Sequence, residues 1–457
     1  MAEVAAGAGI ALAAEEVLST TLQAGVATYF LAKPTQPLGA AFTRIAVVHD
    51  DELHKRSLTR SNHTVTVVGS KAYIFGGETS DGEVAGNEVH IINLAPEEKT
   101  KEPEYQLIPA LAGAGGRVPQ GRTRHAACAF DGGVVVYGGH STNDGRPADE
   151  GIIWHFNPEE NTWSVLYSPS DHNGKALKPV SQVRVFPTST SLILLTGTEV
   201  DGINYIHKFT PASSPGLSSN RYEILTTPPT PTSASNAAFY EDHLYLISSP
   251  DAVSSQLHIL PLTIKEGEKP KWTTLTFPTN PIVPGPRARH AGALLPFSTG
   301  YGRNYLVYLL GARSQLPSTT TTTTSNITEL DLSSTTSDKE RINVEEPTQW
   351  SDTWTLQLPS SDLQPHVSTS LKDAIKPAKI KDAIRGGVGA DSGKWTWAEV
   401  EVRVPDDLGG AEAGKLHPGP RASFGADVMA DGKSVVLWGG VDAEGDKVGD
   451  GWVVRLE

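Results

Sequence analysis

The 457-residue chain has a single cysteine, Cys128, and it has no long apolar segment. One cysteine excludes an intramolecular disulfide, so a disulfide-stapled fold is excluded and a reducing compartment is favoured. The apolar stretch 10–14 ends at Glu15, far short of the roughly 20 apolar residues that a membrane-spanning helix needs. Glu3 stands where a secretory signal carries basic residues. We therefore expect a cytoplasmic protein that has no membrane attachment.

Basic residues are also scarce relative to acidic ones. Lys and Arg number 38 against 52 Asp and Glu, and the net charge of -14 has the wrong sign for binding nucleic acid. Long helical patterns are few, whereas 44 glycines and 32 prolines supply many turns. This composition predicts a chain built mainly from β-strands.

Three short motifs recur along the chain and define a repeat. The first is Arg-x-x-His or a variant of it, which begins at Arg60, Arg122, Arg287 and Arg421. The second is an apolar strand that ends in Gly-Gly in three copies and in a degenerate version in the other three, with the last residue at positions 77, 139, 197, 249, 311 and 440. The third is an acidic or amide residue followed by an outer strand, and a further strand with Trp often comes next. Six copies of four short strands predict a ring of six sheets.

These motifs resemble the kelch family of β-propellers, within the galactose-oxidase-like propeller superfamily. The resemblance covers about residues 40–457 and implies an all-β, six-bladed kelch-type β-propeller. Its physical basis is that a short four-stranded sheet cannot bury both faces alone, so neighbouring blades bury each other. The last copy lacks an outermost strand after Leu456, and the segment 43–48 can supply it, which would remove an exposed sheet edge.

The rest of the chain falls outside the repeat. Residues 1–38 are expected to form an N-terminal helical extension, with an amphipathic helix over 15–33 that ends before Pro34. The propeller would then occupy 39–457. Its fifth blade carries two insertions: a low-complexity, Thr-rich one at 318–348 and a helical, basic one at 360–393.

Two rings of side chains are expected on one face of the propeller. The innermost strand of each blade starts at this face and the second strand returns to it. Guanidinium groups offer paired donors to carboxylates and phosphates, so we expect a protein segment or a small anionic ligand to bind there. The alternative is that the arginines pair with loop carboxylates and tie the blades together. The expected ligand-binding residues are Arg60, Glu78, Arg122, His140, Glu199, Arg287, Arg313, Arg421 and Asp442.

Histidines and the cysteine have simpler expected roles. His63, His125 and His290 follow an Arg by three residues, so they point to the other side of the strand. We expect them to form hydrogen bonds between blades. Cys128 stands inside an apolar strand, where we expect it to pack. The acidic loop at Asp442 fits a solvated turn as well as a cation site.

Signatures of catalysis are few. The chain has no Gly-x-Ser-x-Gly, His-Glu-x-x-His or Cys-x-x-Cys motif. Copper oxidases of this fold class need a thioether-forming cysteine with Tyr and His ligands, and no such pattern accompanies Cys128. Plant specifier proteins, which are kelch propellers, bind ferrous iron through Glu-x-x-x-Asp-x-x-x-His. Glu199 and His207 match the ends of that motif, but Ile203 replaces its middle ligand, so we expect no cofactor.

The sequence thus favours a monomeric kelch-repeat interaction module. The alternative is a small-molecule metabolic enzyme that uses the same pocket. Some kelch proteins with this outline act as isomerases, lyases or pericyclases, and such chemistry needs only shape and a few hydrogen-bond donors. A deep apolar pocket would favour the enzyme, and a wide polar rim would favour the interaction module.

Overall fold

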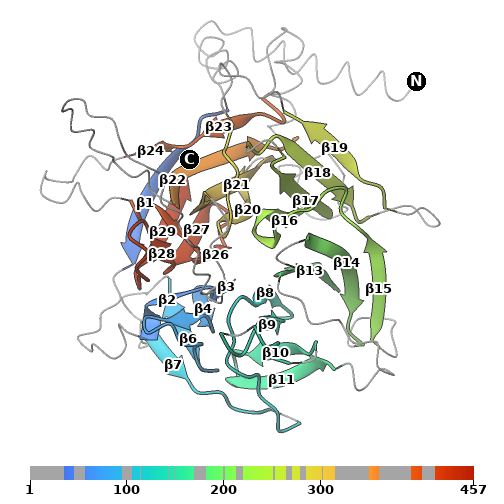
Figure 1. Cartoon of the computed structure of the whole chain (residues 1–457), viewed down its shortest axis with the longest axis vertical. Coiled ribbons are helices and arrows are strands. Elements are labelled where there is room, and N and C mark those ends of the chain that lie inside the picture. The colour runs from blue at the N-terminus through green and yellow to red at the C-terminus, as the bar shows by residue number, and fades with distance from the viewer. Residues whose placement is uncertain are drawn as a thin grey trace, which may run out of the picture.

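Six sheets form a closed ring around a central channel, as Figure 1 shows. This confirms the predicted all-β, six-bladed propeller. None of the helices in the described part of the chain is long and apolar enough to cross a membrane. The computed structural model describes residues 35–45, 57–94, 105–113, 115–143, 145–149, 151–168, 182–198, 201–212, 220–250, 253–263, 270–277, 285–300, 302–313, 349–359, 393–403 and 417–457.

Blades 1 to 5 are antiparallel sheets of four strands each, taken in chain order from the channel outwards. Blade 1 consists of β3 (Thr64–Val68), β4 (Lys71–Phe75), β6 (Val89–Asn93) and β7 (Tyr105–Ile108). Blade 2 consists of β8 (Ala126–Phe130), β9 (Gly133–Tyr137), β10 (Ile153–Asn157) and β11 (Thr162–Tyr167). Blade 3 consists of β12 (Gln182–Pro187), β13 (Leu192–Thr198), β14 (Gly202–Thr210) and β15 (Arg221–Thr226). Blade 4 follows a short 3-10 turn, η2 (Ala234–Asn236), and consists of β16 (Ala237–Tyr240), β17 (His243–Ser248), β18 (Gln256–Pro261) and β19 (Thr273–Thr276). Blade 5 consists of β20 (Ala293–Gly300), β21 (Arg303–Ala312), β22 (Gln349–Gln357) and β23 (Trp397–Glu399).

Blade 6 is completed by the N-terminal strand. It contains β26 (Gly425–Val428), β27 (Ser434–Trp438) and β29 (Gly451–Leu456), and β1 (Gly39–Ile45) pairs antiparallel with β29. The predicted closure is therefore confirmed, although the pairing strand is 39–45 rather than 43–48. The earlier start buries Ala40 and Phe42 in the core, which fixes the register. A short strand, β24 (Glu401–Val402), pairs parallel with β1 on its outer side.

The hydrophobic core is divided among the contacts between blades. The described residues form six buried clusters, and each cluster draws side chains from two neighbouring blades. Blade 6, for example, meets blade 1 through Val436 and Val65, and it meets blade 5 through Leu437 and Leu309. Since alternate residues of a strand face opposite neighbours, every blade depends on both adjacent blades for burial.

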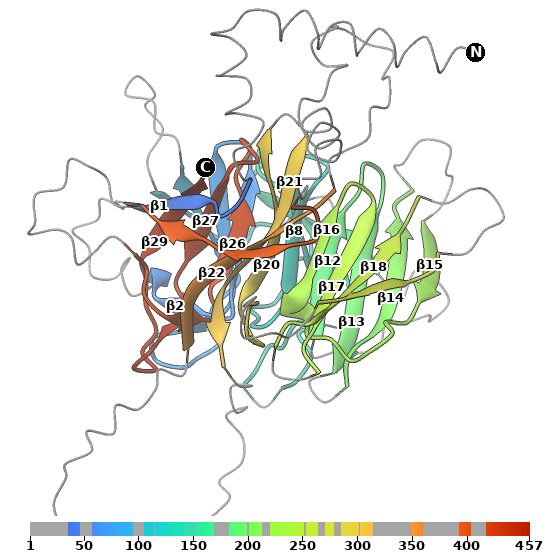
Figure 2. The same cartoon turned by 90° about the horizontal axis from the view of Figure 1, so that it is seen from above.

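Two small ladders lie at one end of the ring, where Figure 2 labels β2. There β2 (Arg60–Ser61) pairs with β5 (Glu78–Thr79), and β25 (Arg421–Ala422) pairs with β28 (Val441–Asp442). Each ladder joins the Arg motif to the residues that follow the glycine pair, so both lie at this end, which we call the Arg face. The predicted helix over 15–33 and the insertion at 318–348 lie outside the described residues, as does 360–393 except for Gly393.

Candidate functional site

Arginines of the repeated motif are buried at the Arg face. Arg60, Arg122 and Arg421 are at most 3% exposed. Each guanidinium donates through Nη1 to the carbonyl oxygen of the first glycine of its own blade's pair. The distances to Gly76, Gly138 and Gly439 are 2.9, 2.9 and 3.2 Å. The chain itself therefore occupies donors that the sequence analysis assigned to a ligand.

Most of these arginines also meet a carboxylate that is fixed by a tryptophan. In blade 2, Arg122 Nη2 lies 2.6 Å from Asp149 Oδ2, which accepts the indole N–H of Trp154 at 2.7 Å. Blade 6 repeats this arrangement with Asp450 and Trp452. Although burial favours the neutral form of Asp450, the hydrogen bonds and charge of Arg421 hold its pKa below the usual value.

Blade 1 replaces this arrangement with an imidazole. Arg60 Nη2 donates to His90 Nε2 at 2.8 Å, so the ring proton lies on Nδ1, which meets the Tyr105 hydroxyl at 2.9 Å. Glu88 supplies the nearby carboxylate, 3.8 Å from the ring nitrogen. Burial lowers the pKa of Arg60 to about 10, which still leaves it charged at neutral pH.

The ring position of blade 5 belongs to Arg289, so the predicted alignment of Arg287 was wrong. Arg289 is fully buried, donates to Leu310 O at 3.0 Å and pairs with Asp352 at 3.0 Å. Arg287 is exposed. In each of these four blades, the residue two places after the buried arginine has a left-handed backbone. This conformation aligns Arg289, and not Arg287, with the buried arginines of the other blades. The φ values of Asn62, Arg124, Ala291 and Ser423 are 54°, 55°, 50° and 57°.

Histidines after the motif pack on the glycine pair of the preceding blade. The His125 ring contacts Thr64 Oγ1 at 2.8 Å, which confirms its predicted hydrogen bond between blades. A Cβ on Gly76 would lie 2.7 Å from the same ring and 2.3 Å from a carbonyl oxygen, so the repeat needs glycine there. His290 does not share this place, because the corrected alignment puts Gly292 there.

Other predicted site residues have individual surroundings. Glu78 accepts from Asn62 and Thr123, both at 3.1 Å, and so links blades 1 and 2. His140 pairs through its backbone with Thr123. The guanidinium of Arg313 lies 4.0 Å from the centre of the Trp350 ring. Asp442 accepts the backbone N–H groups of Glu444 and Asp446, which is the geometry of a capped turn.

The iron-motif residues are not brought together in the described part of the chain. Glu199 lies outside the described residues. His207 stands on β14, where it meets Thr196 Oγ1 at 3.1 Å and stacks on Tyr222. No group of three or more His, Cys, Asp or Glu side chains that could hold a metal occurs among the described residues.

The central channel contains charged groups that the sequence analysis missed. Its cavity measures about 360 Å³ and is lined mainly by β3, β8, β12, β20 and β26. Arg184 of β12 lies on this wall, with its guanidinium 5.6 Å from the Phe186 ring. It forms no hydrogen bond or ion pair with any residue that the structure describes. Burial lowers its pKa, and the charge of Asp427 opposes that shift.

Asp427 of β26 lies on the wall of the same channel. Its two carboxylate oxygens accept the backbone N–H groups of Val67 and Val428, both at 2.8 Å, so it caps amides of the innermost strands. Burial raises the pKa of Asp427 to about 6 in spite of these hydrogen bonds. Cys128 lines the channel as well, and burial raises the pKa of its thiol far above the usual value, so the thiol is unreactive.

A sequence signal for the channel residues does exist. Innermost strands elsewhere in the ring read as apolar or small residues, whereas Arg184 and Asp427 place charge within such strands. An isolated charge in a strand that lines a propeller axis can only face the channel or a buried partner. No described side chain forms a hydrogen bond or ion pair with Arg184, although the charge of Asp427 in the same channel acts on it.

The kelch-repeat family model and the curated relatives agree with this architecture. A family model described as the KLHDC2/KLHL20/DRC7 Kelch-repeats domain matches residues 54–248, which run from blade 1 into blade 4. Kelch domain-containing protein 3 from Homo sapiens is 26% identical over 114 residues, and the protein from Mus musculus is 25% identical over the same length. These matches cover 23% of this chain and 27% of those proteins. The solved structure of YjhT has a TM-score of 0.48 and 14% identity, and the superposition covers 87% of this chain and 97% of that one.

Proposed function

Since this chain is a kelch-repeat β-propeller, we propose that it is an interaction module that binds an anionic protein segment in its central channel. The matched relatives share only part of their length with this chain, so the proposal rests on the site itself. Its main support is Arg184, a guanidinium that faces a cavity of about 360 Å³ without a partner among the described residues.

The motif arginines contribute less than the sequence suggested. Arg60, Arg122 and Arg421 use their donors inside their own blades. Arg184 is different because its donors stay available in a partly enclosed place, where a charge-assisted hydrogen bond is stronger than in open water. A carboxylate side chain of a bound segment would accept hydrogen bonds from this guanidinium, and it would balance the charge of Arg184 once Asp427 is protonated.

Asp427 adds a pH dependence to this binding. Its negative charge opposes an anion in the same channel, and protonation removes that charge. Because its pKa lies at about 6, we expect tighter anion binding at pH 5 than at pH 8. The enzyme alternative gains no support from a metal centre, since the described residues include no group of three or more His, Cys, Asp or Glu side chains that could hold a metal ion.

Calorimetric titration with an acetylated, amidated hexaglutamate peptide tests the proposal. Binding should weaken about tenfold or more in Arg184→Gln, because a charge-assisted hydrogen bond contributes roughly 1.5–3 kcal/mol. Arg221→Gln is the matched control, since Arg221 is an exposed arginine on β15, outside the channel, whose side chain pairs with Glu223 on the same strand. Hexaglutamine should not bind.

Two results would refute the proposal. One is a wild-type protein that does not bind hexaglutamate at millimolar concentration at pH 5 and low salt. The other is equal binding by Arg184→Gln and Arg221→Gln, which would place the peptide elsewhere on the surface.

A further inference from the structure

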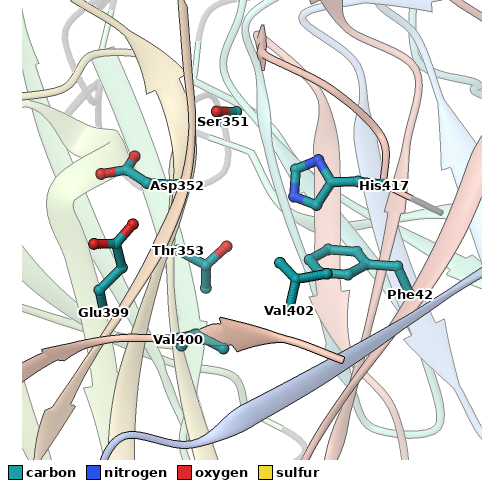
Figure 3. A pocket seen from close by; sticks show the side chains of 8 residues that line it. All are labelled: Phe42, Ser351, Asp352, Thr353, Glu399, Val400, Val402 and His417. Carbon is teal, nitrogen blue, oxygen red and sulfur yellow. The ribbon is translucent and has the colours of Figure 1, made fainter. Parts of the chain in front are cut away.

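A second cavity lies between blades 5 and 6, away from the central channel. It measures about 280 Å³ and is lined by Phe42, Ser351, Asp352, Thr353, Glu399, Val400, Val402 and His417. Figure 3 shows Asp352 and Glu399 on one side, His417 and Phe42 on the other, and Thr353 between them. We call it the blade 5/6 pocket.

Its charges leave one carboxylate without a cation. Asp352 is neutralised by Arg289 at 3.0 Å and also accepts the Trp354 indole N–H at 2.7 Å. Glu399 has no hydrogen bond or ion pair with a described residue. Partial burial raises its pKa, the charge of Asp352 adds to this effect, and the charge of Arg289, which is already paired with Asp352, opposes it. The pocket therefore carries about one uncompensated negative charge at neutral pH.

The imidazole in the pocket does not cancel this charge. His417 Nδ1 accepts the backbone N–H of Gly419 at 3.0 Å, and the ring packs edge-on against Phe42 at 4.4 Å. Burial and the nearby charge of Arg421 lower its pKa, so the ring is neutral at pH 7. Phe42, with Val400 and Val402, gives the pocket an apolar wall beside the carboxylates.

A buried hydroxyl gives independent evidence for a ligand. Thr353 is only 5% exposed, and its Oγ1 has no hydrogen-bond partner. Buried polar groups are usually satisfied, because a buried group without a hydrogen bond has lost its water and gained no partner in return. Figure 3 shows this side chain between the two carboxylates on one side of the pocket and His417 on the other.

From this arrangement we infer that the blade 5/6 pocket binds the lysine or arginine side chain of a partner peptide. The cationic end lies between Glu399 and Asp352 and donates to Thr353 Oγ1. The aliphatic stem packs on Phe42 and Val402, and the ring face of Phe42 favours a nearby cation. This site is separate from the proposed anion site and does not depend on it.

Saturation-transfer NMR titrations with capped pentapeptides, Gly-Gly-Lys-Gly-Gly and its arginine and acetyl-lysine versions, test the inference. We expect the lysine or arginine peptide to bind and the acetyl-lysine peptide not to bind. Glu399→Gln should weaken binding about tenfold or more. Glu401→Gln is the matched control, because Glu401 is exposed on the adjoining strand and does not line the pocket.

A second variant guards against misfolding. Thr353→Val keeps the side-chain shape and removes the hydroxyl, and it should weaken binding severalfold without lowering the melting temperature. Arg184→Gln should leave binding of the basic peptides unchanged, which separates this site from the channel. The inference is overturned if no basic peptide binds the wild type, if the acetyl-lysine peptide binds equally well, or if Glu399→Gln and Glu401→Gln behave alike.

Discussion

Replacing Arg122 with alanine should destabilise the propeller strongly. The side chain is fully buried and donates to Gln120 O at 3.1 Å, to Gly138 O at 2.9 Å and to Asp149 at 2.6 Å. Removing the guanidinium takes a donor away from two carbonyl oxygens and leaves the Asp149 carboxylate without its cation. The Asp149 side chain is only 11% exposed, so water compensates this charge poorly. Breaking a buried ion pair from one side costs about 3–5 kcal/mol, so we expect a loss of that size.

The matched control is Arg287→Ala. Arg287 stands in the same kind of sequence motif but is exposed, so its removal should change stability by less than about 0.5 kcal/mol. Urea unfolding followed by tryptophan fluorescence gives both values. Two variants that lie within 0.5 kcal/mol of each other would refute the structural role assigned to the buried arginines.

Three further predictions concern closure, acid stability and the glycine pairs. Deleting residues 1–45 removes the closing strand, so stability should fall by several kcal/mol and the exposed edge should promote self-association in gel filtration; an unchanged unfolding midpoint would contradict the closure. Burial, with the charge of Arg60, lowers the pKa of His63 to about 3. Between pH 6.5 and 3 the unfolded state therefore binds a proton at His63 that the folded state does not, so stability decreases as the pH is lowered through that window. His63→Phe, which copies Phe424 of blade 6, should reduce that slope by up to about 1.4 kcal/mol per pH unit in urea titrations at pH 7, 6 and 5; parallel slopes would show that His63 titrates normally. Gly76→Ala should cost roughly 2 kcal/mol more than Gly82→Ala, because both have positive φ but only the first Cβ meets a carbonyl oxygen. If both variants lose the same stability in thermal unfolding, the positive φ alone explains the loss, and the predicted clash at Gly76 is wrong.

The ring architecture could be predicted because its signals are local. Glycine pairs at positive φ, apolar strands before them and a missing last strand are all readable along the chain. The alignment of blade 5 could not be read correctly, because Arg287 and Arg289 both fit a loose Arg motif. The burial of Arg289 and the left-handed backbone at Ala291 decide between them, and the Ala291 carbonyl accepts a hydrogen bond from Ser423 N of blade 6 at 2.7 Å, a contact that forms only in the folded ring.

The candidate site was harder to predict than the fold. Burial of Arg122 depends on Asp149 and Trp154, which lie 27 and 32 residues further along the chain and meet it only after the sheet forms. Arg184 lies in a blade that lacks the Arg motif, so a search guided by the motif passes over it. Its significance depends on which groups surround it in the channel, and pairing between distant strands decides that.

Anomalous diffraction from crystals soaked in selenate at pH 5 tests the central claim most directly. Selenate is a small oxyanion, and the anomalous signal of its selenium atom locates it even when the natural binding partner is not known. At this pH Asp427 is largely protonated, given its pKa of about 6. The account predicts a selenium peak in the channel within hydrogen-bonding distance of the Arg184 guanidinium, and no such peak in Arg184→Gln. Wild-type crystals with selenium peaks on the outer surface and none in the channel would contradict it.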